Sequence, residues 1–190
     1  FLSLGSGSSG NCYFFGNAFQ GILIDAGISA RAVRKNLSEI GIDMTQILGV
    51  FISHDHVDHI KAVGSLSDRF NLPIYATKKT HEGISKNWNS PSVLNGNKKY
   101  LETGQTLNVG DFSISPYSVS HDASDSVCFH LEYRSHKILI ATDLGYANDD
   151  IFRLVNCCDI VILEANYDID MLEKGSYPYY LKQRIISDSG

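Results

Sequence analysis

The residues with the clearest chemical potential stand in the segment SHDHVDH, residues 53–59, where three of the chain's seven histidines and two aspartates lie together. Imidazole nitrogens and carboxylate oxygens form a donor set that suits zinc, and also manganese, iron or nickel. Such a concentration has no purpose in core packing, and a plain surface loop would rarely contain it. The segment therefore predicts a metal site built from His54, His56, Asp58 and His59.

Four side chains of one short loop would not bind a single ion comfortably. Alternate residues of an extended segment project the same way, so His54 and His56 form one natural pair. Asp58 and His59 then face a second position. The spacing predicts two divalent ions that lie close together, each with further ligands from elsewhere in the chain.

Further candidates lie at the ends of predicted strands. His121 follows the run YSVS and would complete the site of His54 and His56, whereas Asp143 follows the run ILIAT and would bridge the two ions. Asp25 ends the run GILI and is predicted to accept an N–H from a ligand imidazole, with a turn-forming role as an alternative of equal weight. The other three histidines are expected not to be ligands: His81, His130 and His136.

The elements that must position these side chains follow one another irregularly. Ser29 would cap an early helix whose apolar stripe is Val33, Leu37 and Ile40, and Gly41 would end it. This order of elements favours an α/β (α+β) layered domain with two sheets over a regular alternation of strands and helices. The sequence pattern predicts helices at residues 29–41, 59–70 and after Pro178, buried strands at 47–53 and 159–165, and a hairpin at 126–142.

The composition is that of one globular domain, with 190 residues of which 43% are hydrophobic and 19% charged. No apolar run approaches the roughly 20 residues that a membrane helix needs, so no membrane association and a cytoplasmic location are expected. The net charge of −5 argues against a protein that coats nucleic acid non-specifically. The cysteines have no metal-type spacing and are expected to be buried thiols: Cys12, Cys128, Cys157 and Cys158.

The segment HDHVDH matches the H-x-H-x-D-H signature of the metallo-β-lactamase superfamily, and Asp25, His121 and Asp143 occur in that superfamily's order. Several segments are similar to the YycJ (WalJ)-type branch, a group of bacterial proteins described as 5′→3′ exonucleases acting on DNA. These segments are SLGSGSSGN, SHDAS, ATDLG and LEANYD. The resemblance covers almost the whole chain and implies a four-layer αββα sandwich with a dinuclear metal site at the open edge of its two sheets.

The end of the chain departs from this branch. In proteins of this branch, the last metal-binding histidine lies in a Gly-His-Leu-Ser segment that follows a stretch similar to RIISDSG. The present sequence stops at RIISDSG, so that histidine would be the next residue. We therefore expect residues 1–190 to be a single metallo-β-lactamase-fold domain without its C-terminal strands and helix, so that the second half of the sandwich is incomplete. The second ion, at Asp58 and His59, is expected to bind more weakly than the first, and this form of the chain is expected to be weakly active or inactive.

The resemblance implies metal-dependent hydrolysis of phosphodiester bonds in DNA, with two zinc or manganese ions that convert a water held between them into the attacking hydroxide. Asp58, His59 and Asp143 would be the catalytic residues, with Asp58 orienting or deprotonating the water. A thioester hydrolase of the glyoxalase II type shares the full ligand set and is the main alternative. A non-catalytic metal-binding regulatory protein is another, whereas a β-lactam hydrolase is disfavoured because many of those enzymes have other residues where His59 and Asp143 stand.

The segment SLGSGSSGN is predicted to be a loop between early strands that approaches a phosphate closely. Its donors to the DNA backbone would be Ser6, Ser8, Ser9 and Asn11, although a tight turn explains the glycines almost as well. Lysine and arginine clusters and the aromatic segment YPYYLK are further candidate contacts to nucleic acid, with solvated charges and side-chain packing as the alternatives.

Overall fold

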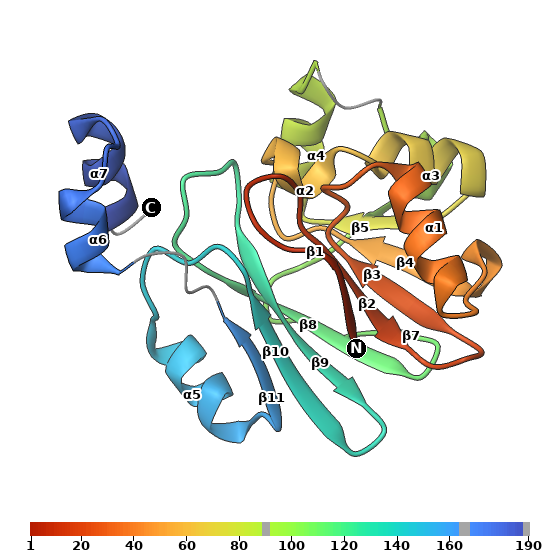
Figure 1. Ribbon diagram of the computed structural model, residues 1–190. Helices are drawn as coiled ribbons and strands as arrows, with labels where there is room; N and C mark the ends of the chain where they lie inside the picture. The colour runs from red at the N-terminus through yellow and green to blue at the C-terminus, as the bar shows by residue number, and fades with distance from the viewer. Residues whose placement is uncertain (89–91, 164–167, 188–190) are drawn as a thin grey trace. The chain divides into compact units, whose positions relative to one another are not determined.

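The computed structural model describes residues 1–88, 92–163 and 168–187, which form two compact units. The first unit contains Phe1–Glu102 and Ala123–Asp125, and the second contains Thr103–Asp122 and the described residues from Ser126 onward. Each unit is built on one β-sheet, and the ribbon in Figure 1 follows the chain through both. The mixed α/β class with two sheets is therefore confirmed.

The sheet of the first unit has the strand order β1-β2-β3-β4-β5-β6. The first three strands are antiparallel neighbours, whereas β3 to β6 run parallel. Parallel strands have their C-terminal ends at one edge, so the segments that follow β3 and β4 start side by side. The strands are β1 (Leu2–Gly5), β2 (Cys12–Gly16), β3 (Gly21–Ile24), β4 (Ile47–Phe51), β5 (Ile74–Ala76) and β6 (Lys98–Tyr100).

Helices cover one face of this sheet and enclose its hydrophobic core (Figure 1). The core joins apolar residues of the strands with Val33, Leu37, Val63, Leu66 and Ile84 of the helices. The helices are α1 (Ala30–Glu39), α2 (Val57–Ile60), α3 (Val63–Phe70) and α4 (Lys78–Lys86), and two 3₁₀ turns are η1 (Met44–Gln46) and η2 (Asn95–Asn97).

Helix α1 confirms the predicted cap and corrects the predicted stripe. The Ser29 hydroxyl accepts a hydrogen bond from the Ala32 backbone N–H at 3.2 Å. Val33 and Leu37 are fully buried, but Ile40 is 48% exposed because it lies at the C-cap, where the chain already turns away from the sheet.

The helix predicted over residues 59–70 is wrong in one respect, because the structure divides it into α2 and α3. The backbone carbonyls of Asp58 and His59 accept from the amides of Asn11 and Ala26, both at 2.7 Å. The Ala62 amide, which would continue the helix, donates instead to the Ala26 carbonyl at 2.8 Å. The early loops thus take the hydrogen bonds that a continuous helix would use internally.

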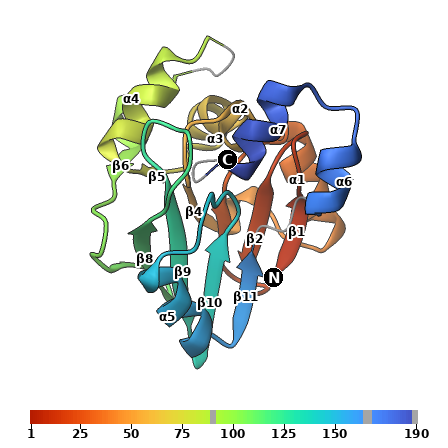
Figure 2. The same ribbon diagram turned by 90° about the vertical axis from the view of Figure 1, so that its left-hand side faces the viewer.

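The second unit contains a sheet with the order β11-β10-β9-β8-β7. Strands β10 and β11 are parallel and the other neighbours are antiparallel. Figure 2 shows α5 beside β10, where Ile151 and Leu154 pack with Leu139 and Ala141. The elements are β7 (Leu107–Val109), β8 (Phe112–Ser118), β9 (Val127–Tyr133), β10 (His136–Ala141), α5 (Asp149–Cys157), β11 (Ile160–Leu163), α6 (Ile169–Lys174) and α7 (Tyr179–Ile186).

Strand β11 is present as predicted, but the expectation that it is buried is wrong. Ile160 is 42% exposed and Leu163 is 47% exposed, because β11 forms an edge of its sheet. The helix after Pro178 is confirmed as α7, whereas β6 and α6 were not predicted. Among the described residues, no helix has the length and apolar character that crossing a bilayer requires.

The cysteines follow their predicted role only in part. Cys12 and Cys128 are buried, and burial raises the pKa of both thiols, that of Cys128 to about 12. Cys157 is exposed, which corrects the expectation that all four are buried. A thiol with a raised pKa stays protonated near neutral pH and is a poor metal ligand, so Cys12 and Cys128 are unsuited to binding a cation as thiolates.

Candidate metal centre

The C-terminal ends of β3 and β4 bring Asp25 beside the segment that carries the histidines. The two strands are parallel neighbours, and the Asp25 amide donates to the Phe51 carbonyl at 2.8 Å. The Ser53 amide in turn donates to Asp25 Oδ1 at 2.8 Å. Asp25 is fully buried and has a left-handed backbone, with φ of 59°. The sheet edge therefore fixes a carboxylate directly beneath the segment with His54, His56 and His59.

Asp25 and Ser53 determine which ring nitrogens of two histidines carry a proton. His59 Nδ1 lies 2.8 Å from Asp25 Oδ2, and a carboxylate can only accept, so Nδ1 is the donor. The Ser53 hydroxyl donates to the same carboxylate at 2.9 Å and therefore accepts from His54 Nδ1 at 3.0 Å. Both imidazoles thus carry the lone pair on Nε2, the form in which a histidine binds a metal through that atom.

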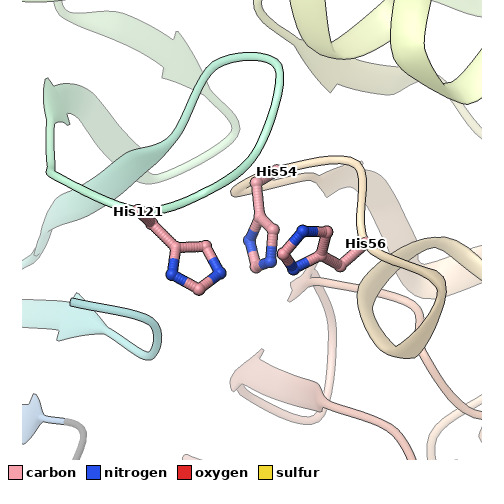
Figure 3. Close-up of side chains that lie close together, drawn as sticks. All are labelled: His54, His56 and His121. Carbon is pink, nitrogen blue, oxygen red and sulfur yellow. The ribbon is translucent and has the colours of Figure 1, made fainter. Parts of the chain in front are cut away.

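The three histidines of the segment are close neighbours. The His54 ring lies 4.7 Å from the His56 ring and 4.1 Å from the His59 ring, measured between centroids. Asp58 Oδ2 is 3.6 Å from His59 Nε2. Figure 3 labels His54 and His56 on the loop after β4. Three imidazoles and a carboxylate that converge on one sheet edge are a donor set that fits a divalent metal ion.

The second unit contributes its own pair of predicted ligands. Strands β8 and β10 both run antiparallel to β9, so their C-terminal ends share an edge, and they lead to His121 and Asp143 respectively. His121 Nε2 lies 3.8 Å from Asp143 Oδ1. The Gly145 amide donates to the Ser120 carbonyl at 2.8 Å, which ties the two loops together.

Asp122 follows His121 and binds α7. Arg184 Nε donates to Asp122 Oδ2 at 2.7 Å, and a terminal nitrogen of Arg184 donates to Oδ1 at 3.0 Å. The hydrogen bond to Asp122 raises the pKa of Arg184 above its usual value. The bidentate ion pair fixes the loop that carries His121 to the helical part of its own unit.

Asn11 lies next to the second predicted metal position. Its backbone amide donates to the Asp58 carbonyl at 2.7 Å, and Nδ2 donates to His59 Nε2 at 3.0 Å. Its Oδ1 accepts from the Gly7 amide at 2.9 Å. Asn11 is only 7% exposed, and direct contact of its amide with a DNA phosphate stays a prediction. In the structure it holds the Gly- and Ser-rich loop against Asp58 and His59.

The serines of that loop lie where a substrate could reach them. Ser6, Ser8 and Ser9 are exposed between β1 and β2, as the predicted loop requires. The Tyr13 hydroxyl donates to Ser6 Oγ at 3.2 Å. Contact of these serines with a phosphate stays a prediction.

Among the described residues, the structure gives no hydrogen bond between residues 53–59 and the three histidines that were predicted not to be ligands. His81 Nε2 donates to the Lys99 carbonyl at 3.0 Å, and burial lowers the pKa of His81. Burial also lowers the pKa of His130, which lies within β9. His136 is exposed at the start of β10. Two other segments used for the resemblance, LEANYD and RIISDSG, lie partly outside the described residues.

Two residues with positions in this network were not assigned from the sequence. Ser53 links His54 to Asp25, and Asp55 accepts a hydrogen bond from the Ser124 hydroxyl. A serine directly before a histidine is a local signal for a hydroxyl beside the ring, but nothing in the sequence shows the direction in which it points.

Comparison with known proteins agrees with this geometry. The sequence family described as Beta-lactamase superfamily domain matches residues 20–178. The chain is 32% identical over 195 residues to "Exodeoxyribonuclease YycJ" of Bacillus anthracis, with 100% of this chain and 71% of the relative covered. It is 34% identical over 187 residues to "Exodeoxyribonuclease WalJ" of Streptococcus pneumoniae serotype 2, with 98% and 70% covered.

A solved structure shows the same fold. The metallo-β-lactamase fold protein YhfI from Bacillus subtilis superimposes with a TM-score of 0.68 at 22% identity, over 84% of this chain and 65% of that one. The profile match spans most of the chain and the two exodeoxyribonuclease matches span nearly all of it. The chain therefore belongs to the metallo-β-lactamase superfamily and, within it, to the family of the YycJ and WalJ proteins.

Proposed function

We propose that this protein is a metal-dependent exodeoxyribonuclease that hydrolyses phosphodiester bonds of DNA at a site with two divalent ions. The observation that carries the proposal is the convergence of His54, His56, Asp58 and His59 beside Asp25, in a chain 32–34% identical to two proteins named exodeoxyribonucleases. One ion would be held by His54, His56 and His121, the other by Asp58 and His59, and Asp143 would bridge them. Zinc and manganese suit this mixture of imidazoles and carboxylates.

The course of the chain supports a role for His121 in this site. Ala123–Asp125 belongs to the first unit, and the Ser124 backbone N–H and hydroxyl both donate to Asp55, which stands between His54 and His56. His121 precedes Ser124 by three residues, and a chain spans at most about 3.6 Å per residue. The covalent chain thus keeps His121 within reach of the two histidines on either side of Asp55.

The charges of the segment support metal dependence. Asp25, Asp55 and Asp58 all lie at the sheet edge where the substrate would react. A phosphodiester is an anion, so these carboxylates alone would repel it. Divalent ions at the site would reverse the local charge, lower the pKa of a bound water and neutralise charge that develops on the phosphoryl oxygens.

The chain's own residues would contribute orientation and proton transfer. Asp25 would keep the proton of His59 on Nδ1. Binding of the ion through Nε2 would replace the hydrogen bond that Nε2 accepts from the Asn11 amide. The half-exposed Asp58 would orient the attacking water and accept its proton. Asn11 would hold the Ser6–Gly10 loop beside this carboxylate, where Ser6, Ser8 and Ser9 could bind the phosphate backbone. We propose a single domain that acts in the cytoplasm without membrane attachment.

The proposal predicts that His56→Ala in the full-length protein abolishes DNA degradation. Removal of a first-pair ligand leaves the ion without one of its imidazoles, so turnover of end-labelled double-stranded DNA in the presence of Mn²⁺ or Zn²⁺ should fall by at least about a hundredfold. His136→Ala is the matched control, because His136 is exposed at the start of β10 and should leave the rate unchanged.

The same assay separates the alternatives. Hydrolysis of a thioester without degradation of DNA would contradict the nuclease and favour the glyoxalase II type of activity. Metal binding with no turnover of DNA, thioester or a chromogenic β-lactam would favour a non-catalytic metal-binding protein.

A further inference from the structure

Asp55 is the one acidic or imidazole side chain of residues 54–59 that the proposed ligand set leaves unused. It stands between His54 and His56, yet its carboxylate is directed at Ser124, 69 residues later in the chain. Oδ1 accepts from the Ser124 backbone N–H at 3.1 Å, and Oδ2 accepts from the Ser124 hydroxyl at 2.6 Å. Both oxygens thus bind one residue, an arrangement that fixes direction as well as distance.

Helix α4 provides the space for this carboxylate. Gly83 lies so close that a Cβ at this position would overlap Asp55 Oδ2. One turn earlier, the Thr80 hydroxyl donates to the Asp125 carbonyl at 3.0 Å. The segment Ala123–Asp125 is therefore attached to the first unit at two successive residues, by Asp55 at Ser124 and by Thr80 at Asp125.

We propose that Asp55 is a positioning residue that fastens Ala123–Asp125 to the metal-binding segment and thereby determines where His121 presents its imidazole. This inference rests on the proposed function, in which His121 is a ligand of the first ion. His121 precedes Ser124 by three residues, so a fixed Ser124 restricts the distance that the His121 ring can move away. A ligand held near its ion binds at high effective concentration, whereas a ligand on a free loop first loses conformational entropy.

Gly83→Ala tests whether the Asp55–Ser124 hydrogen bonds position His121. It changes neither a proposed metal ligand nor Asp55 or Ser124. The added methyl group would displace the Asp55 carboxylate. In a helix, glycine to alanine is otherwise favourable for stability, so the variant should fold. Gly96→Ala is the matched control, because a Cβ at Gly96 meets no atom within 4 Å.

The measurements are the affinity for Co²⁺ and the visible absorption of bound Co²⁺, which depends on the number and geometry of its ligands. Gly83→Ala should bind the first cobalt ion at least about tenfold more weakly, as is common when a partner behind a ligand is lost, and should change the absorption per bound ion. The cobalt spectrum decides between the two roles, because loss of the Asp55–Ser124 hydrogen bonds would lower the thermal midpoint in either case. A role of Asp55 in general stability alone would lower this midpoint and leave the cobalt spectrum unchanged.

Two further variants test the contact if Gly83→Ala does not fold. Ser124→Ala removes the hydroxyl and keeps the backbone N–H, and Asp55→Asn keeps one accepting oxygen, so both should show the same spectral change with a smaller loss of affinity than Asp55→Ala. If these variants bind Co²⁺ with the affinity and spectrum of the unaltered chain, the inference is wrong and the proposed function stands. If the unaltered chain binds no Co²⁺, both are wrong.

Discussion

Asp25 occupies a backbone conformation that residues other than glycine rarely adopt, and its hydrogen bonds hold it there. Its φ of 59° lies in the left-handed region, where aspartate and asparagine are the usual residues apart from glycine. From there the carboxylate accepts from the Ser53 amide, the Ser53 hydroxyl and His59 Nδ1. Only an ionised carboxylate can accept all three without presenting a donor of its own.

Asp25→Asn should therefore weaken metal binding while preserving the backbone. Asparagine tolerates the left-handed conformation, but its NH₂ group would face a donor on Ser53 or His59, so the tautomer of His59 is no longer fixed. We expect affinity for the ion at Asp58 and His59 to fall by roughly 10–100-fold in a Zn²⁺ titration. Asp43→Asn, at an exposed cap, is the control, and equal affinities in the two variants would contradict this role of Asp25.

The residues of the site differ in how far the sequence could predict them. His54, His56, Asp58 and His59 were found because their spacing is local and their side chains have few other uses together. For Asn11 the sequence suggests a contact with the substrate, but it does not reveal that the side-chain amide binds His59, 48 residues away. Asp55 likewise depends on Ser124. Contacts between distant residues follow from the packing of loops, and no periodicity in the sequence encodes them.

Helix α1 supports the metal-binding segment indirectly, through the hydrophobic core of the sheet. Val33 and Leu37 pack into the core below the sheet whose edge carries Asp25 and His54. The apolar pattern correctly predicted that Val33 and Leu37 are buried and wrongly predicted the same for Ile40. Ile40 continues the apolar spacing, but it lies one residue beyond the end of the helix. The same kind of limit applies at α2 and α3, where contacts with Asn11 and Ala26 interrupt a continuous apolar pattern.

Leu37→Ala should destabilise the fold, whereas Ile40→Ala should not. Leu37 is fully buried, so its truncation leaves a cavity that costs about 2–5 kcal/mol in the free energy of unfolding. Ile40 is 48% exposed, and substitutions at such positions usually change stability by less than about 0.5 kcal/mol. Urea denaturation of the two variants measures the difference, and similar losses for both would mean that Ile40 belongs to the core after all.

For the molecule as a whole, buried neutral histidines connect stability with pH. His81 in the first unit donates to the Lys99 carbonyl, and His130 in the second unit has an Nε2 with no hydrogen-bond partner among the described residues. Burial lowers the pKa of both groups in the folded protein, whereas in the unfolded chain each is near 6.5. Between these values the unfolded state binds more protons than the folded state, so stability must rise with pH there.

The free energy of unfolding should therefore decline as pH falls below about 6.5. In the His130→Leu variant this free energy should decline less steeply. Leucine removes the titrating group from β9 and leaves an apolar side chain of similar size in a position that is 8% exposed. His136→Gln is the control, because it replaces an exposed imidazole at the start of β10. Urea denaturation from pH 5 to 8, in the presence of a chelator so that loss of metal does not contribute, gives the slope for each variant.

An equal slope for His130→Leu and the unaltered chain would show that His130 is not forced to stay neutral in the folded protein. The decline would then have to come from His81, whose pKa burial also lowers.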